Sequence, residues 1–160
     1  MIILAKIALI IILLWIAYQD IKPREVYWFL FPAVAIFGGL LFYAVDSVGL
    51  QGYSVLINLM VITMFLLIIH FYVKLKMGAS LISVIGLGDV LLFIALGCSF
   101  TSMAFILTFV FSLIFALVLH LYLSKKQHFQ TVPLAGYMSI FYAVIYLTFW
   151  SGLSPNLYSL

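Results

Sequence analysis

Apolar stretches alternate with short polar ones along almost the whole chain. A helix needs about 20 mainly apolar residues to cross the roughly 30 Å hydrocarbon core of a bilayer. The apolar stretches cover residues 2–18, 26–45, 53–73, 103–123 and 132–150, with one more that contains Asp89 and ends near Gly97. The pattern therefore predicts an all-α integral membrane protein in which residues 1–160 form a single bundle of about six transmembrane helices.

Composition favours the same class of protein. Of the 160 residues, 68% are hydrophobic and only 7% are charged, whereas a soluble domain has about 25% charged residues. Ten tyrosines and three tryptophans suit helix ends that lie at the two bilayer interfaces. The net charge of +3 is spread over the loops, so we interpret it as a determinant of topology and expect no nucleic-acid partner.

Basic residues occur in alternate polar loops and so predict an orientation. Lysine and arginine concentrate in the cytoplasmic loops of membrane proteins. The basic loop residues are Lys22 and Arg24, then Lys74 and Lys76, then Lys125 and Lys126. We therefore expect these three loops to be cytoplasmic and both termini to lie outside. Lys6, within the first apolar stretch, is the one basic residue that disagrees.

A carboxylate flanked by glycines, Gly86-Leu87-Gly88-Asp89, interrupts the apolar pattern. A charge at membrane depth costs roughly 2.5 to 3.5 kcal/mol on insertion scales, so such residues usually face a protein interior or a wet cavity. Asp89 is therefore a candidate functional residue. The two glycines either bend the chain inside the membrane or open a helix at its edge, and the sequence leaves both readings open.

A second acid, Asp20, is predicted to share this side of the bundle. It closes the first apolar stretch, whereas Asp89 opens or interrupts the fourth. Two carboxylates that lie a few ångströms apart do not both ionise readily, so the pair shares a proton. The ionised member can then deprotonate a water that attacks a peptide carbonyl, while the protonated member donates to the carbonyl oxygen.

Other roles for these acids stay open on the residues alone. Asp20 could cap the second helix or pair with Lys22 or Arg24. Asp89 could pair with Lys74, Lys76 or a backbone N–H and serve packing, or it could be a proton relay in a small proton-coupled transporter or channel. A transporter would depend on the membrane potential or a pH gradient and would not need Asp20.

These residues resemble a known family. Gly86-Leu87-Gly88-Asp89 matches the GxGD motif of intramembrane aspartyl proteases, and residues 20–26 resemble the first-aspartate motif of type IV prepilin and preflagellin peptidases. Residues 131–137 are similar to the segment that opens the last helix of that family. The resemblance implies that Asp20 and Asp89 are the catalytic pair. It also implies supporting roles for Gly86, Gly88, Lys22, Arg24, Pro133 and Gly136.

The resemblance further implies an activity. Members of this family are aspartic endopeptidases that remove a basic leader peptide from type IV prepilin-like precursors, which reach the enzyme as signal-anchor helices in the lipid bilayer. We accordingly expect a multi-pass protein of the bacterial inner membrane, with its site toward the cytoplasm, that serves type IV pilus assembly or protein secretion.

Two departures from the family narrow this expectation. Longer, bifunctional members carry paired CxxC motifs linked to N-methylation, whereas Cys98 is the single cysteine here, so a peptidase-only form is expected. The lysine that often follows the GxGD motif is replaced by Val90-Leu91-Leu92, which bears on substrate contacts.

No metal or other cofactor is expected, since carboxylates and water suffice for this hydrolysis. Three histidines fall near the predicted cytoplasmic ends of helices or in a loop, namely His70, His120 and His128. None of them has another histidine three or four residues away, so we interpret them as interfacial side chains and not as metal ligands.

Overall fold

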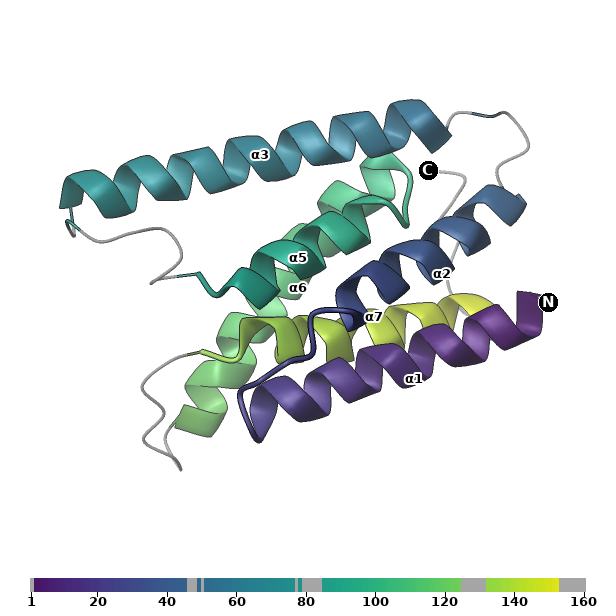
Figure 1. Cartoon of the computed structure of the whole chain (residues 1–160), viewed down its shortest axis with the longest axis horizontal. Helices are drawn as coiled ribbons and strands as arrows, with labels where there is room; N and C mark the ends of the chain where they lie inside the picture. The colour runs from purple at the N-terminus through teal and green to yellow at the C-terminus, as the bar shows by residue number, and fades with distance from the viewer. Residues whose placement is uncertain are drawn as a thin grey trace.

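A computed structural model describes residues 2–45, 51–76, 85–124 and 132–152, together with Gly49 and Gly78. Throughout this part of the chain the regular elements are α-helices (Figure 1). They are α1 (Ile2–Ile21), α2 (Leu30–Val45), α3 (Gln51–Lys76), α5 (Leu87–Gly97), α6 (Ser102–Ser124) and α7 (Leu134–Trp150). The predicted all-α class is confirmed for these residues, and each predicted apolar stretch overlaps one helix.

The helices fall into two length classes. Three of them, α1, α3 and α6, are long and apolar enough to cross a membrane. The other three are shorter apolar helices of 16, 11 and 17 residues, namely α2, α5 and α7. At 1.5 Å per residue, α5 is only about 16 Å long, which is roughly half of a hydrocarbon core. The helices thus support a membrane protein, while six complete spans and the predicted orientation stay predictions.

The surface of the bundle is apolar and its interior is rich in aromatic rings. Ile3 and Tyr53 are each 72% exposed, which lipid tails tolerate and water does not. Inside, the ring of Phe93 meets Phe109 edge-on at 5.1 Å, and Phe100 stacks on Tyr146 at 5.2 Å. Such ring pairs add to the packing of the core beyond their buried area.

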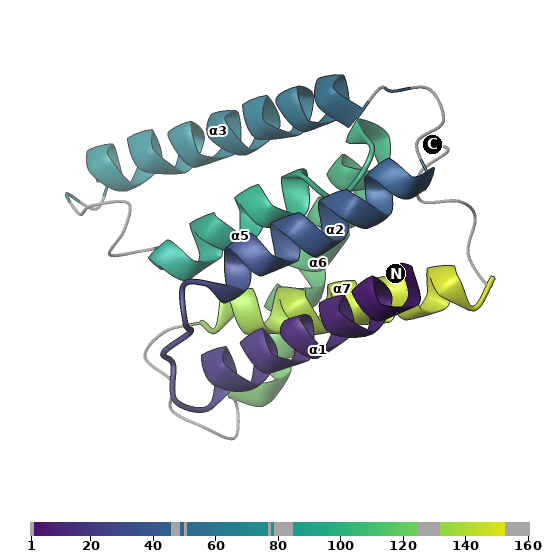
Figure 2. The ribbon, with the colours of Figure 1, turned by 45° about the vertical axis from the view of Figure 1, so that its right-hand side comes forward.

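Three helix ends meet at one end of the bundle. α1 packs against α7 and α2, and α5 packs against α2. The C-terminal end of α1 and the N-terminal ends of α5 and α7 all lie on the left-hand side of Figures 1 and 2. This arrangement brings together Asp20, Asp89 and the start of α7, although more than 100 residues separate the first from the last.

A buried asparagine holds the far end of α5. Asn58 of α3 is fully buried, and its Nδ2 donates hydrogen bonds of 2.9 Å to the carbonyl oxygens of Gly97 and Phe100. Helix ends leave carbonyl groups without intrahelical partners, and each one is costly to bury in an apolar medium. Asn58 therefore allows α5 to end inside the bundle after 11 residues.

Lys6, which disagreed with the predicted orientation, packs at the opposite end from the acids. Its Nζ lies 5.1 Å from the centre of the Trp150 ring, at the end of α7. A cation over an aromatic face is attracted by the ring quadrupole. Lys6 therefore joins α1 to α7, so its charge has a packing role.

Candidate active site

Asp20 and Asp89 occupy helix ends that face each other. Asp20 is the last residue but one of α1 and is half-buried, whereas Asp89 lies in the first turn of α5 and is only 9% exposed. Asp89 is buried and Asp20 is partly shielded from solvent, so both carboxylates gain from hydrogen-bond donors of the protein.

Both carboxylates are bound by consecutive peptide groups of α7. The N–H of Ala135 donates to Asp89 Oδ1 at 2.7 Å, and the N–H of Gly136 donates to Asp20 Oδ2 at 2.6 Å. Adjacent amides of one helical turn point in similar directions along the helix axis. The two carboxylates therefore lie side by side over the N-terminus of α7.

The hydrogen bonds of the first turn of α7 explain why these two amides are available. The N–H of Leu134 donates to Val132 O at 2.9 Å, and the N–H of Tyr137 donates to Pro133 O at 3.2 Å. Pro133 itself has no N–H to donate. Pro133, the residue before the helix, makes no side-chain cap. Of the first-turn N–H groups, only those of Ala135 and Gly136 are left to donate outside the helix. A helix N-terminus also favours negative charge, so carboxylates are suitable acceptors for them. The two acids thus take the place of a capping residue.

Gly136 permits the close approach of α1. A Cβ atom at this position would lie 3.1 Å from Asp20 Cβ, Asp20 Oδ2 and Ile21 Cγ1. These distances are tighter than ordinary van der Waals contact, and the Asp20 carboxylate could relax only by leaving the Gly136 amide. The predicted supporting role of Gly136 therefore has a steric basis.

In the described part of the chain, which resumes at Ile85, the GxGD segment opens a helix. α5 begins at Leu87, and Gly86 precedes it in an extended conformation, with φ −59° and ψ 147°. Asp89 Oδ2 accepts a 3.1 Å hydrogen bond from Gly86 N–H. Besides binding the Ala135 amide of α7, Asp89 thus caps the N-terminus of its own helix. A Cβ at Gly88 would lie 3.3 Å from Phe31 Cζ of α2. Each residue of the motif except Leu87 thus has a defined structural task.

The two basic residues after α1 differ in their relation to the acids. Arg24 is half-buried, and its charge acts on the Asp20 carboxylate. Its backbone has a left-handed φ of 60°, and its N–H donates to Gln19 O at 2.9 Å. Lys22 is exposed, with its Nζ 5.2 Å from the centre of the Tyr18 ring. Arg24 is therefore part of the site, whereas Lys22 covers an aromatic surface beside it.

Sequence reasoning missed two residues of the site. Ala135 contributes only its backbone amide, so no side-chain pattern marks it, although a helix start after Pro133 implies free amides in the next turn. Gln19 is 6% exposed, and its Oε1 accepts a 3.2 Å hydrogen bond from Tyr27 N–H. A glutamine next to Asp20 at the end of an apolar stretch was a usable signal, because buried polar side chains need partners.

His70 and His120 belong to no group of metal ligands within the described part of the chain. Among residues 2–45, 51–76, 85–124 and 132–152, no three histidine, cysteine or acidic side chains are grouped so as to hold a metal ion. The ring of His120 lies 6.5 Å from that of Tyr137. His128, Lys125 and Lys126 lie outside the described residues.

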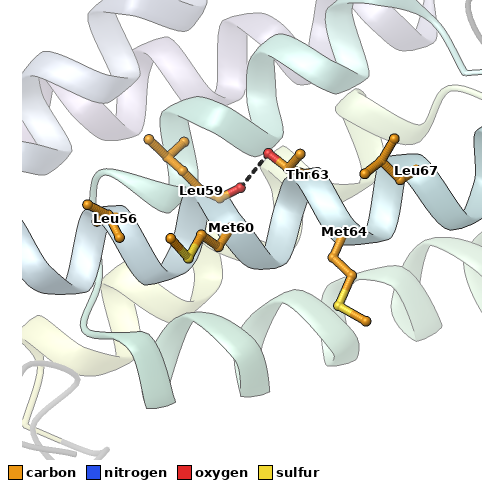
Figure 3. Close-up of a pocket in the computed structure, with 6 residues that line it drawn as sticks. All are labelled: Leu56, Leu59, Met60, Thr63, Met64 and Leu67. Atoms are coloured by element: carbon orange, nitrogen blue, oxygen red, sulfur yellow. Dashed lines mark hydrogen bonds between the residues drawn. The ribbon is translucent and has the colours of Figure 1, made fainter.

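An apolar groove runs along α3 (Figure 3), and neither acid is among its lining residues. Its one polar side chain, Thr63, donates a 2.7 Å hydrogen bond to Leu59 O of its own helix. The lining residues are Leu56, Leu59, Met60, Thr63, Met64 and Leu67. The groove offers no acid, base or nucleophile and is not a candidate catalytic site.

Residues 7–121 match the type IV leader peptidase family. The chain belongs to this family. The matched residues include Asp20 and Asp89 and end before α7, so the amides of Ala135 and Gly136 lie beyond the match. No curated protein and no solved structure was found to match the chain. Family membership and the apolar helices together make the protein a membrane peptidase.

Proposed function

We propose that the protein is an aspartic endopeptidase in which Asp20 and Asp89 form the catalytic pair. One observation carries the proposal: consecutive amides of α7 hold both carboxylates side by side in a member of a leader peptidase family. A carboxylate pair held in this way has the donors and acceptors that water-mediated peptide hydrolysis requires.

The reaction follows from a pair that carries one proton. The ionised carboxylate takes a proton from a water molecule, whose oxygen attacks the carbonyl carbon of the scissile bond. The protonated carboxyl donates its proton to the carbonyl oxygen, which gives a tetrahedral diol. The C–N bond then breaks as the carboxyl that took the water proton passes it to the leaving nitrogen. A hydroxyl of the diol gives its proton to the other carboxylate as the product carboxyl group forms, so the pair again carries one proton. The amides of Ala135 and Gly136 keep both carboxylates oriented throughout.

The proposed substrate is a prepilin-like precursor with a basic leader and a hydrophobic anchor helix. The acids lie at the ends of apolar helices, where the anchor of a substrate could stay in lipid while its leader reaches the pair. Lys74 and Lys76 lie in the last turn of α3, and Asp20 lies in the last turn of α1. The C-terminal ends of these two helices are on the same side of the bundle (Figure 1). This placement supports a cytoplasmic site in the bacterial inner membrane, because basic residues favour that side.

A proton-coupled transporter accounts for less of the geometry. A relay at Asp89 explains a buried acid among apolar helices, but it gives no reason for Asp20 to be held by the adjacent amide. The two proposals differ in their dependence on Asp20 and on the membrane potential.

The direct test is cleavage of a leader-bearing precursor. The full chain is expressed with a prepilin-like substrate, and the N-terminus of the product is sequenced for the wild type, Asp20→Asn and Asp89→Asn. Both variants should abolish cleavage, because asparagine keeps the shape of aspartate and cannot exchange the proton. Glu25→Gln is the matched control, since Glu25 is an exposed acid. Cleavage at the wild-type rate by either aspartate variant would refute the proposal.

A further inference from the structure

Ser139 of α7 is a buried hydroxyl that the proposed reaction does not use. It is 0% exposed, and its Oγ makes no hydrogen bond to any residue that the structure describes. A hydroxyl buried without a partner is costly, so a residue of this kind calls for a ligand or an ordered water.

Several other hydroxyls in these helices donate to a carbonyl oxygen of their own helix. Thr108 Oγ1 donates to Ala104 O at 2.7 Å, Ser112 Oγ donates to Phe109 O at 2.7 Å, and Thr148 Oγ1 donates to Ile145 O at 2.9 Å. The carbonyl groups three and four residues earlier are thus ordinary acceptors for a serine in a helix. Ser139 uses neither, so its buried hydroxyl has no partner among the residues that the structure describes.

The position of Ser139 places it one turn beyond the amides that hold the acids. Ser139 follows Ala135 by four residues and Gly136 by three, so it lies on the same face of α7 as these two residues. In an α-helix the Cα–Cβ bond tilts toward the N-terminus. The hydroxyl therefore leans back toward the turn over which Asp20 and Asp89 lie.

We propose that Ser139 binds a buried water molecule beneath the Asp20–Asp89 pair and is a positioning residue for that pair. A hydroxyl can donate to a water or accept from it, and a buried water needs at least two polar partners. The Asp20 carboxylate receives the Gly136 hydrogen bond on Oδ2, so Oδ1 can accept one from this water. The bound water would orient Oδ1 of Asp20, while the N-terminus of α7 holds Oδ2 of the same carboxylate.

Among the residues that the structure describes, Arg24 in the loop after α1 and Tyr137 in α7 are charged or titratable groups that interact with Asp20. Lys125, Lys126 and His128, in the chain between α6 and α7, lie outside the described residues. Arg24 acts on both Asp20 and Tyr137. Neither residue is altered in the test below, so both contribute equally to all the proteins compared.

The test compares Ser139→Ala with Ser112→Ala in the full chain in lipid vesicles. Ser112 is also fully buried, but its hydroxyl is bonded within its own helix. Ser139→Ala should lower kcat for a leader-bearing precursor by about 10- to 100-fold, as expected for a lost hydrogen bond to a charged group. KM should stay unchanged, because the water does not contact the leader. Ser112→Ala should leave kcat within about twofold.

A second measurement does not require turnover. The infrared carbonyl band of a protonated carboxyl is followed against pH, and Asp20→Asn and Asp89→Asn assign it to the pair. The water donates to the ionised carboxylate, so its loss should make deprotonation harder. The band should therefore disappear at a higher pH in Ser139→Ala and at the wild-type pH in Ser112→Ala.

The two measurements separate failure of this inference from failure of the proposed function, on which it rests. Wild-type kcat together with an unmoved band in Ser139→Ala would overturn the water site and leave the peptidase assignment intact. An equal band movement in both serine variants would also overturn it. If the wild type cleaves no leader-bearing precursor, the proposed function fails, and the infrared comparison still decides for or against the water.

Discussion

The peptide N–H of Gly136 donates a 2.6 Å hydrogen bond to the carboxylate of Asp20, although the two residues are 116 positions apart in the chain. This contact joins the last described helix to the first one. Because the preceding amide binds Asp89, a small shift of α7 would change the geometry of both acids together.

A methyl group at Gly136 should therefore impair the site. In Gly136→Ala the new Cβ would lie 3.1 Å from Asp20 Cβ and Oδ2, so the carboxylate must move away from its amide. A displacement of about 1 Å at a reacting group can cost about 100-fold in rate, and we expect a loss of this order in precursor cleavage. Gly52→Ala is the control, because a Cβ there has no neighbour within 4 Å. Equal rates for the two variants would contradict the steric role of Gly136.

Removal of one amide donor should also slow the reaction. Ala135→Pro deletes the N–H that binds Asp89 Oδ1 at a first-turn position, where proline is tolerated better than in a helix interior. A hydrogen bond to a charged group contributes about 1.5 to 3 kcal/mol, so cleavage should fall by about 10- to 150-fold. Met103→Pro is the control, because Met103 is an exposed residue in the first turn of α6. If both variants lose activity equally, the effect belongs to folding and not to the site.

The pH dependence of cleavage should be bell-shaped. At low pH both carboxyls are protonated and no base remains, while at high pH both are ionised and no acid remains. The rate of precursor cleavage in vesicles, measured across the range in which the protein stays folded, should fall on both sides of a maximum. Glu25→Gln should leave the profile unchanged, since this acid is exposed. A flat profile would argue against a shared proton.

The two basic residues after α1 should differ in their importance. Arg24→Gln removes a half-buried charge that acts on Asp20, so we expect cleavage to fall by about tenfold, which corresponds to about 1.4 kcal/mol. Lys22→Gln removes an exposed charge of the same sign two residues earlier and should change the rate by less than about twofold. Initial cleavage rates at equal protein levels provide the comparison, and a larger effect of Lys22 would reverse the assignment.

Asn58 should matter for stability and not for chemistry. Asn58→Ala leaves the carbonyl groups of Gly97 and Phe100 without their 2.9 Å hydrogen bonds, which should lower the free energy of unfolding by about 2 to 4 kcal/mol. Thr63→Ala, on the exposed side of the same helix, should change it by less than about 0.5 kcal/mol. Denaturant unfolding in detergent measures both values. Similar values for the two variants would show that Asn58 does not hold the end of α5.

The sequence by itself determined the all-α class, the number of apolar helical segments and the two acids worth attention. These features depend on local composition: long apolar runs predict helices, and a charge among them stands out because it is costly to bury. The motif around Asp89 likewise predicted a special backbone, and the helix that begins at Leu87 is a local consequence of Gly86 and Asp89.

Tertiary structure alone decided how those acids are held. The hydrogen bonds from Ala135 and Gly136 join α7 to α5 and α1, and backbone amides are chemically the same in every residue except proline, so no residue type marks them. The same reason applies to the early end of α5, which depends on Asn58 of another helix, and to the difference between Lys22 and Arg24, which depends on where each side chain packs. Local preferences select the helices, but only the packing of their ends assembles the site.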